Sequence, residues 1–147
     1  MSSSACDMLV SVLHDADEDD KRIRAVLLDE RYTTYAAYVE EQLVGAVVMR
    51  WDEDANEIEY VAVDNACRGR GYGKAMMAQM LALAQQRGVR AVLVGTTNSS
   101  LENIAFYQKC GFRMDHVRRD YFAYIQPPIV QNGIAMRDML VLRYSWA

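Results

Sequence analysis

The sequence lacks the features of several large protein classes. No apolar run approaches the roughly 20 residues that a membrane-spanning helix needs. The opening residues, MSSSACD, lack the basic and apolar regions of a signal peptide. No internal repeat, linker or low-complexity tract interrupts the 147 residues. We therefore expect one domain that spans residues 1–147 and has no membrane partner.

Cysteine is scarce, and the excess of charge is small. Cys6, Cys67 and Cys110 have no metal-ligand spacing and cannot all pair with one another. This pattern suits a reducing cytoplasm and predicts no metal site. The net charge of −4 argues against a broad nucleic-acid surface and is compatible with cationic substrates. We therefore expect a cytoplasmic protein that binds no nucleic acid.

What the sequence does contain is a globular composition, with 52% hydrophobic and 24% charged residues. The run from Met8 to Leu13 predicts a short strand, and the acidic stretch over residues 15–20 offers Asp17 as the N-cap of a short helix. That acidic stretch either caps and solvates the helix or attracts an amine substrate. Three strands are then predicted, with short turns between them that imply an antiparallel meander, over residues 35–40, 43–51 and 57–63.

The second half alternates helices and strands. In chain order we predict a helix, a strand, a helix, an aromatic-rich segment and a last strand, over residues 73–87, 91–94, 101–109, 112–125 and 136–144. Gly88 and Gly111 stand where a helix ends, and Asn132-Gly133 is a hairpin signal. The predicted fold class is α/β, with a mixed, mostly antiparallel central sheet of about seven strands flanked by helices.

The stretch over residues 61–74 joins a strand to a helix through three alternating glycines. Backbone N–H groups at a helix start have no partner inside the helix, and the helix dipole adds positive charge, so this stretch predicts an anion site. A Walker A loop is excluded, because Arg68 stands where its first glycine belongs and Ala75 follows Lys74. The dinucleotide fingerprint is excluded as well, because Lys74 stands at its last glycine position.

The remaining pattern, Arg68-x-x-Gly71-x-Gly73, resembles the acetyl-coenzyme A loop of the GNAT superfamily of N-acetyltransferases. Downstream, residues 98–112 read NSSLENIAFYQKCGF, and the end of this segment is similar to the signature on the fourth helix of GNAT enzymes. The two motifs occur in the family's order and approximate separation. The resemblance covers the chain from about Met8 to Tyr144 and implies a GNAT-like fold.

The resemblance also implies residues for binding acetyl-CoA. Main-chain groups of the strand before the loop would hold the pantetheine arm, and the loop would wrap the pyrophosphate. Ser100, Asn103 and Tyr107 share one helix face and, with Asn98, would border the pantetheine and the thioester. The implied cofactor-binding residues are Val61, Ala62, Val63, Arg68, Gly69, Arg70, Gly71, Tyr72, Gly73, Lys74, Asn98, Ser100, Asn103 and Tyr107.

Direct acetyl transfer needs a base for the ammonium proton, donors for the oxyanion and an acid for the thiolate, but no metal and no protein nucleophile. The resemblance implies Tyr107 as the acid; the alternative is a tyrosine that only packs its ring. By the period of two, Glu57, Glu59, Val61 and Val63 point to one face of their strand. The resemblance slightly favours Glu57 as the base over Glu59, and a water molecule or another residue remains an alternative.

We therefore predict an N-acetyltransferase that moves the acetyl group of acetyl-CoA directly to a primary amine. A small-molecule amine is preferred over a protein N-terminus or lysine, because no extended peptide-binding feature is readable in the sequence. The alternative from another class is a non-catalytic acyl-CoA-binding or sensor module on the same fold. A homodimer formed through the aromatic hairpin around Asn132-Gly133 is left open.

Overall fold

A computed structural model describes residues 1–14, 16–17, 19–52 and 56–146. The chain forms two compact units, Met1–Val89 and Arg90–Ala147. Two members of the predicted acidic stretch, Asp15 and Glu18, lie outside the described residues, as does most of the predicted turn at residues 52–56. The expectation of a single domain over residues 1–147 stays a prediction.

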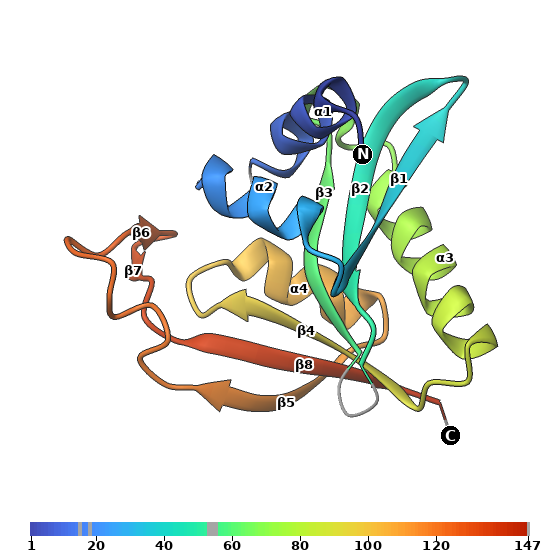
Figure 1. Ribbon diagram of the computed structural model, residues 1–147. Helices are drawn as coiled ribbons and strands as arrows, with labels where there is room; N and C mark the ends of the chain where they lie inside the picture. The colour runs from blue at the N-terminus through green and yellow to red at the C-terminus, as the bar shows by residue number, and fades with distance from the viewer. Residues whose placement is uncertain (15, 18, 53–55, 147) are drawn as a thin grey trace. The chain divides into compact units, whose positions relative to one another are not determined.

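In the first unit, an antiparallel meander carries helices on both faces (Figure 1). Its strands pair in chain order and are β1 (Tyr32–Val39), β2 (Gln42–Arg50) and β3 (Glu57–Val63). Two helices cover one face, α1 (Ser3–Leu13) and α2 (Asp20–Leu28), and a third covers the other, α3 (Tyr72–Gln86). A short 3-10 helix, η1 (Asn65–Cys67), lies between β3 and α3. The predicted meander and the predicted long helix are confirmed.

The predicted strand at Met8–Leu13 is wrong, because these residues belong to α1. The helix begins earlier, where the Ser2 hydroxyl accepts a hydrogen bond from the Ala5 N–H at 3.1 Å. Buried residues then recur three and four positions apart, at Cys6, Leu9 and Leu13. A short apolar run fits a strand or a buried helix equally well, and here the N-cap decides for the helix.

The acidic stretch also behaves differently from the prediction. Asp19, not Asp17, caps α2, because its Oδ1 accepts hydrogen bonds from the N–H groups of Lys21 and Arg22 at 3.1 and 3.3 Å. Asp17 instead accepts a hydrogen bond from the Tyr60 hydroxyl at 2.8 Å. The connection between α1 and α2 is therefore tied to β3 by a hydrogen bond to a carboxylate.

The second unit contains a three-stranded antiparallel arrangement with β8 in the middle. Its strands are β4 (Ala91–Thr97), β5 (Arg113–Arg118) and β8 (Met139–Ser145), and helix α4 (Leu101–Lys109) follows β4. A separate hairpin consists of β6 (Val130–Gln131) and β7 (Ile134–Ala135). The predicted turn at Asn132-Gly133 is confirmed, with φ angles of 55° and 74°. The aromatic-rich segment is a strand only over Arg113–Arg118.

The predicted fold class is confirmed as a mixed α/β fold with antiparallel strands flanked by helices. The described residues contain six strands of six residues or more and two strands of two residues, compared with about seven expected. Among these residues, no helix is both long and apolar enough to cross a membrane.

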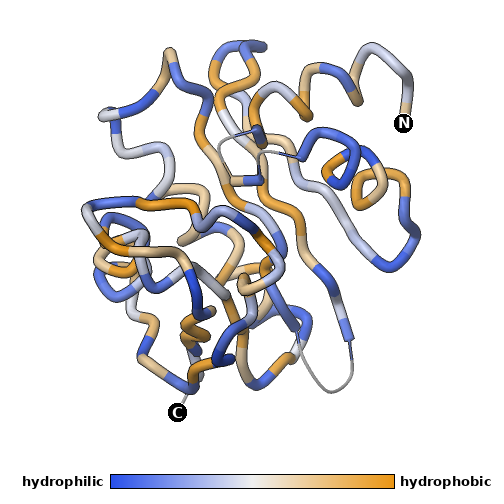
Figure 2. Tube along the Cα trace, turned by 90° about the vertical axis from the view of Figure 1, so that its left-hand side faces the viewer, coloured by the Kyte–Doolittle hydropathy of each residue, from blue (hydrophilic) through white to orange (hydrophobic). Residues whose placement is uncertain are grey.

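The main core of the first unit lies between the α1–α2 pair and the meander. Ile23 of α2 is fully buried there, together with Leu13 of α1 and Val48 of β2. The helices nearest the N-terminus carry both hydrophobic and hydrophilic segments (Figure 2), as expected for helices with one buried face. This packing fixes α1 and α2 on their face of the meander.

We expect Ile23→Ala to lower the free energy of unfolding by about 2–4 kcal/mol, because a fully buried side chain leaves a cavity. Leu28→Ala on the same helix is the matched control, because Leu28 is 65% exposed and its loss should cost less than about 0.5 kcal/mol. Urea unfolding monitored by circular dichroism measures both values. Equal losses in the two variants would contradict this packing.

Candidate functional site

The glycine-rich loop ends in an uncapped helix start. Gly71 is the N-cap of α3 in the left-handed region, with φ 81°, and as a glycine it has no side chain to bond to the N–H groups that follow. The first turn of α3 contains no acidic residue. Arg70 and Lys74 are exposed beside it. N–H groups without an intrahelical partner, the helix dipole and two cations are together chemically suited to bind an anion such as a pyrophosphate.

The strand that leads into this loop lies very close to its neighbours. A Cβ on Gly45 of β2 would come within 2.7 Å of the Ala62 carbonyl oxygen and within 2.7 Å of Met76 Sδ. Only glycine permits this approach of β2 to β3 and α3. Sequence reasoning missed the role of Gly45, although an isolated glycine inside a strand pattern is the signal for such a contact.

The prediction that Glu57, Glu59, Val61 and Val63 share one face is wrong. In the register of β3 with β2, Met49 pairs with Ile58 and Val48 pairs with Tyr60, so Glu59 has no partner and forms a β-bulge. The extra residue resets the alternation. Val61 pairs with Val47, which faces α3, whereas Tyr60 packs against the α1–α2 core.

Both glutamates therefore belong to the α1–α2 side. Glu57 pairs with Arg50 across the strands, and its Oε2 accepts a hydrogen bond from Arg50 Nη2 at 3.1 Å. The two glutamates differ in their partners. Glu57 is committed to this ion pair, whereas no ion-pair partner of Glu59 is found within the described part of the chain.

Glu59 is exposed to solvent, yet its surroundings disfavour a negative charge. Partial burial of its carboxyl raises its pKa above the usual value, and the negative charge of Glu57 raises it further. Arg50 and Arg22 oppose the shift, and Asp17 adds to it. A carboxylate with a raised pKa and no partner is suited to accept a proton.

The second unit holds the other predicted residues. Ser100 is the N-cap of α4 but makes no capping hydrogen bond with its side chain, and Asn103 is exposed one turn later. Asn98 is committed to its own chain: its Oδ1 accepts hydrogen bonds from the N–H groups of Arg137 and Asp138 at 2.9 and 3.0 Å. Its Nδ2 donates to a main-chain carbonyl oxygen, that of Ala135, at 3.0 Å.

Tyr107 is buried, with 5% of its area exposed. Its ring contacts those of Phe106 and Phe112 edge-on, at centroid distances of 5.5 and 5.9 Å. Burial raises the pKa of the Tyr107 hydroxyl well above its usual value, and the neighbouring Cys110 adds to the shift. The hydroxyl thus keeps its proton at neutral pH, and no hydrogen bond to it is found among the described residues.

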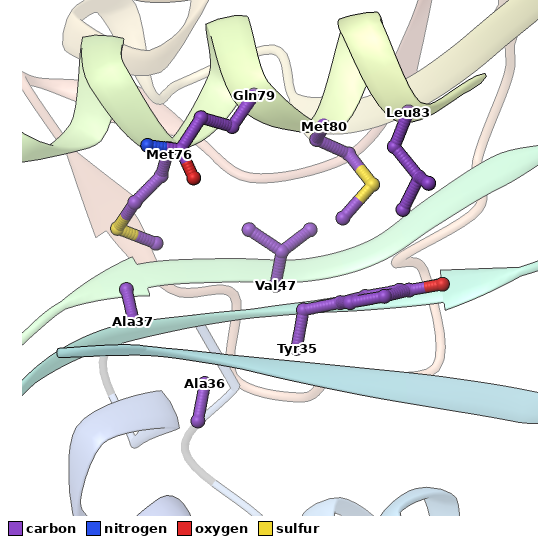
Figure 3. A pocket seen from close by; sticks show the side chains of 8 residues that line it. All are labelled: Tyr35, Ala36, Ala37, Val47, Met76, Gln79, Met80 and Leu83. Atoms are coloured by element: carbon purple, nitrogen blue, oxygen red, sulfur yellow. The ribbon is translucent and has the colours of Figure 1, made fainter. Parts of the chain in front are cut away.

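The first unit also contains a cavity of about 300 Å³ between α3 and the strands β1 and β2 (Figure 3). It is lined by Tyr35, Ala36, Ala37, Val47, Met76, Gln79, Met80 and Leu83. Figure 3 shows Val47 pointing toward α3 and Ala36 pointing away from it. The cavity thus opens on the α3 face of the meander, opposite the face that carries Glu57 and Tyr60.

Cysteine and metal chemistry receive no support from the described residues. Cys6 and Cys67 are buried, Cys110 is half-buried, and none is in a disulfide. Within the described ranges, no group of three or more His, Cys, Asp or Glu side chains is arranged to hold a metal ion.

The mixed α/β fold and the glycine-rich loop before α3 are features expected of an acyltransferase of the acetyl-CoA-dependent class. The model of the acetyltransferase (GNAT) family matches residues 3–112, and the chain belongs to this family. The predicted family is thereby confirmed.

Similar proteins agree with this assignment. The uncharacterized N-acetyltransferase YvbK of Bacillus subtilis is 33% identical over 115 residues, covering 77% of this chain and 74% of YvbK. A B. subtilis acetyltransferase solved with CoA is 31% identical, with a TM-score of 0.87 over 96% of this chain and 93% of its own. A GNAT acetyltransferase from Elizabethkingia anophelis with acetyl-CoA bound is 29% identical, with a TM-score of 0.83 over 92% and 88%.

The chain is therefore an acetyl-CoA-dependent N-acetyltransferase, as predicted, and acetyl-CoA is its co-substrate. The alternative of a non-catalytic sensor module gives way to the enzyme.

Proposed function

We propose that the acceptor is the primary amine of a small cationic molecule. The observation that carries this proposal is the group of carboxylates on the α1–α2 face of β3, formed by Glu57, Glu59 and Asp17. Arg50 pairs with Glu57, and Arg22 with Asp17, which leaves Glu59 as the member of this group for which no ion pair is found among the described residues. An ammonium group supplies the missing positive charge.

An amine panel tests this acceptor class. Thiol release from acetyl-CoA should be measured with polyamines, amino-acid-derived amines, aminoglycosides, and peptides that present a free N-terminus or lysine. We expect turnover with small amines that carry a second positive charge. Turnover confined to peptides would establish the alternative of a protein N-terminal or lysine acetyltransferase.

We propose that acetyl-CoA is held by two sets of residues. In the first unit, the main chain of residues 61–63 binds the pantetheine arm, and the loop and helix start over residues 68–74 bind the pyrophosphate. In the second unit, Asn98, Ser100, Asn103 and Tyr107 border the pantetheine and the thioester. The uncapped N–H groups after Gly71 support the first assignment, and the polar side chains at the start of α4 support the second.

Bound acetyl-CoA supplies an acetyl group activated as a thioester. Glu59 takes the proton from the acceptor ammonium, because it has the raised pKa and no ion-pair partner. Glu57, which the sequence slightly favours, is held by Arg50 and orients that guanidinium instead. Tyr107 keeps its proton at neutral pH and donates it to the leaving sulfur.

A cytoplasmic location remains part of the proposal, supported by three cysteines that form no disulfide in the described part of the chain. Pairing of the aromatic hairpin with a second subunit also stays a prediction.

For the loop, we expect Gly71→Ala to weaken acetyl-CoA binding about tenfold or more, because alanine resists the left-handed φ that presents the N–H groups. Gly88→Ala is the control: Gly88 ends the same helix with φ 78°, and a Cβ meets nothing within 4 Å at either glycine. Both variants should lose about 1 kcal/mol of stability. Calorimetry with acetyl-CoA should separate them, and equal affinities would disprove the loop assignment.

For the base, we expect Glu59→Gln to lower kcat about 10²-fold, with the alkaline plateau of the pH–rate profile lost. Glu57→Gln is the comparison variant and should retain more activity. An unchanged kcat in Glu59→Gln would remove Glu59 from the role of base.

The stability of Glu59→Gln tests the direction of the Glu59 pKa shift independently of the kinetics. The raised pKa means that the folded state holds the Glu59 proton more tightly than the unfolded state does. Its contribution to stability is therefore present below the unfolded-state pKa and is lost as pH rises through the folded-state pKa. The variant should melt no lower than the wild type at pH 8, and any advantage should vanish near pH 4. A lower melting temperature at pH 8 would contradict the raised pKa.

For the acid, we expect Tyr107→Phe to lower kcat about 10²-fold while acetyl-CoA affinity stays nearly intact, because the ring contacts with Phe106 and Phe112 remain. Phe106→Leu is the packing control and should lower stability more than kcat. Steady-state kinetics and calorimetry supply both readouts. If Tyr107→Phe turns over at the wild-type rate, Tyr107 is not the acid and its role is limited to packing its ring.

A further inference from the structure

The turn between β4 and α4 is held from outside by the β6–β7 hairpin. Ser99, in the middle of this turn, is fully buried, and its hydroxyl donates to Gln131 Oε1 at 2.8 Å. The Thr97 hydroxyl donates to the same oxygen at 3.2 Å. One amide oxygen of the hairpin is therefore the shared acceptor for the Thr97 and Ser99 hydroxyl groups.

The Gln131 oxygen accepts the hydrogens of the Thr97 and Ser99 hydroxyl groups and thereby sets their directions. The oxygens of Thr97 and Ser99 lie 3.1 Å apart, and each hydroxyl has a single hydrogen to donate. With Gln131 in place, both hydrogens find an acceptor. Without it, the Ser99 hydroxyl is left with the Thr97 oxygen as its neighbour, and the turn loses one of its anchors to the hairpin.

Asn132 adds a second anchor from the tip of the same hairpin. Its φ of 55° and that of Gly133, 74°, make the two-residue turn for which Asn-Gly is favoured. In this conformation the Asn132 Nδ2 donates to the Ser99 carbonyl oxygen at 2.9 Å and to Glu102 Oε2 at 3.3 Å. The hairpin thus holds both the turn and the first residues of α4.

The N-cap residue of α4 does not fix the helix start with its own side chain. Ser100 is the N-cap of α4, and its side chain makes no capping hydrogen bond. The usual local device that fixes a helix start is therefore absent here, and side chains more than 30 positions away take its place.

We propose that Gln131 and Asn132 are positioning residues for acetyl-CoA. They fix the turn that presents Asn98, Ser100 and the start of α4, and they do so without touching the co-substrate. The proposal rests on the assignment of Asn98, Ser100 and Asn103 to acetyl-CoA binding under the proposed function.

Three variants at Gln131 and Asn132 test it. Gln131→Ala removes the shared acceptor, and Gln131→Glu retains an acceptor oxygen at the same position. Asn132→Gly keeps the left-handed backbone and removes both donors. Gln126→Ala is the control, because Gln126 is exposed and its Nε2 donates to the Ala123 carbonyl oxygen at 3.1 Å, not to the turn.

We expect Gln131→Ala and Asn132→Gly to raise the KM and Kd for acetyl-CoA about five- to tenfold, with kcat at saturation within about twofold. Gln131→Glu should restore the KM, and Gln126→Ala should match the wild type. Steady-state kinetics, calorimetry and melting curves supply the readouts. Wild-type KM and Kd in Gln131→Ala and Asn132→Gly, with a lowered melting temperature alone, would show a structural role and overturn the proposal.

Ser100→Ala and Asn103→Ala, measured in the same assay, separate this proposal from the function on which it rests. If these variants bind acetyl-CoA as the wild type does, the assignment of the turn to the co-substrate is wrong. If they bind it weakly while Gln131→Ala and Asn132→Gly bind it normally, the assignment stands and only the positioning role is wrong.

Discussion

The chemistry proposed for the first unit depends on one unpaired residue in β3. The bulge at Glu59 adds a residue to this strand and changes which side chains share a face. Glu57 and Glu59 accompany Tyr60 toward the α1–α2 pair, whereas Val61 turns toward α3. A regular strand would have placed the carboxylates and Val61 together. Because of the bulge, an acidic surface and an apolar packing surface lie back to back on the same short strand.

The first unit carries two different charge environments. The loop over residues 68–74 carries exposed cations next to free N–H groups, while the α1–α2 face of β3 collects carboxylates. The phosphate-bearing co-substrate suits the first surface, and the cationic amine proposed as the acceptor suits the second. The overall net charge of −4 conceals this division, because it sums two local environments that favour opposite partners.

The parts of the fold that the sequence predicts well are those with local end signals. The helix before Gly88 and the hairpin at Asn132-Gly133 are both marked by residues that favour a left-handed backbone. The stretch from Met8 to Leu13 was ambiguous by itself, and a hydrogen bond from Ala5 to Ser2 made it a helix. The spacing within the two motifs was enough to locate the glycine-rich loop, the helix that follows it, and Tyr107 on the helix before Gly111.

The site's finer geometry depends on contacts that no local pattern encodes. The period of two presumes a regular strand, so the bulge and the resulting division between Glu59 and Val61 could not be predicted. Asn98 was expected to face the co-substrate, yet its side chain bonds to residues about 40 positions later in the chain. The partners of Asp17 and Ser99 are similarly remote. Hydrogen bonds between side chains that are far apart in the chain cannot be inferred from a single sequence.

The glycine at position 45 has a consequence for how this enzyme can change over generations. Any side chain there would collide with the Ala62 carbonyl oxygen and Met76, so β2, β3 and α3 must vary as a unit or not at all. Gln79 of the same helix is exposed and lines the cavity, and it is not among the atoms that a side chain at position 45 would meet first. Libraries built to alter acceptor choice should therefore leave position 45 invariant and place their diversity on surfaces that do not set the spacing between strand and helix.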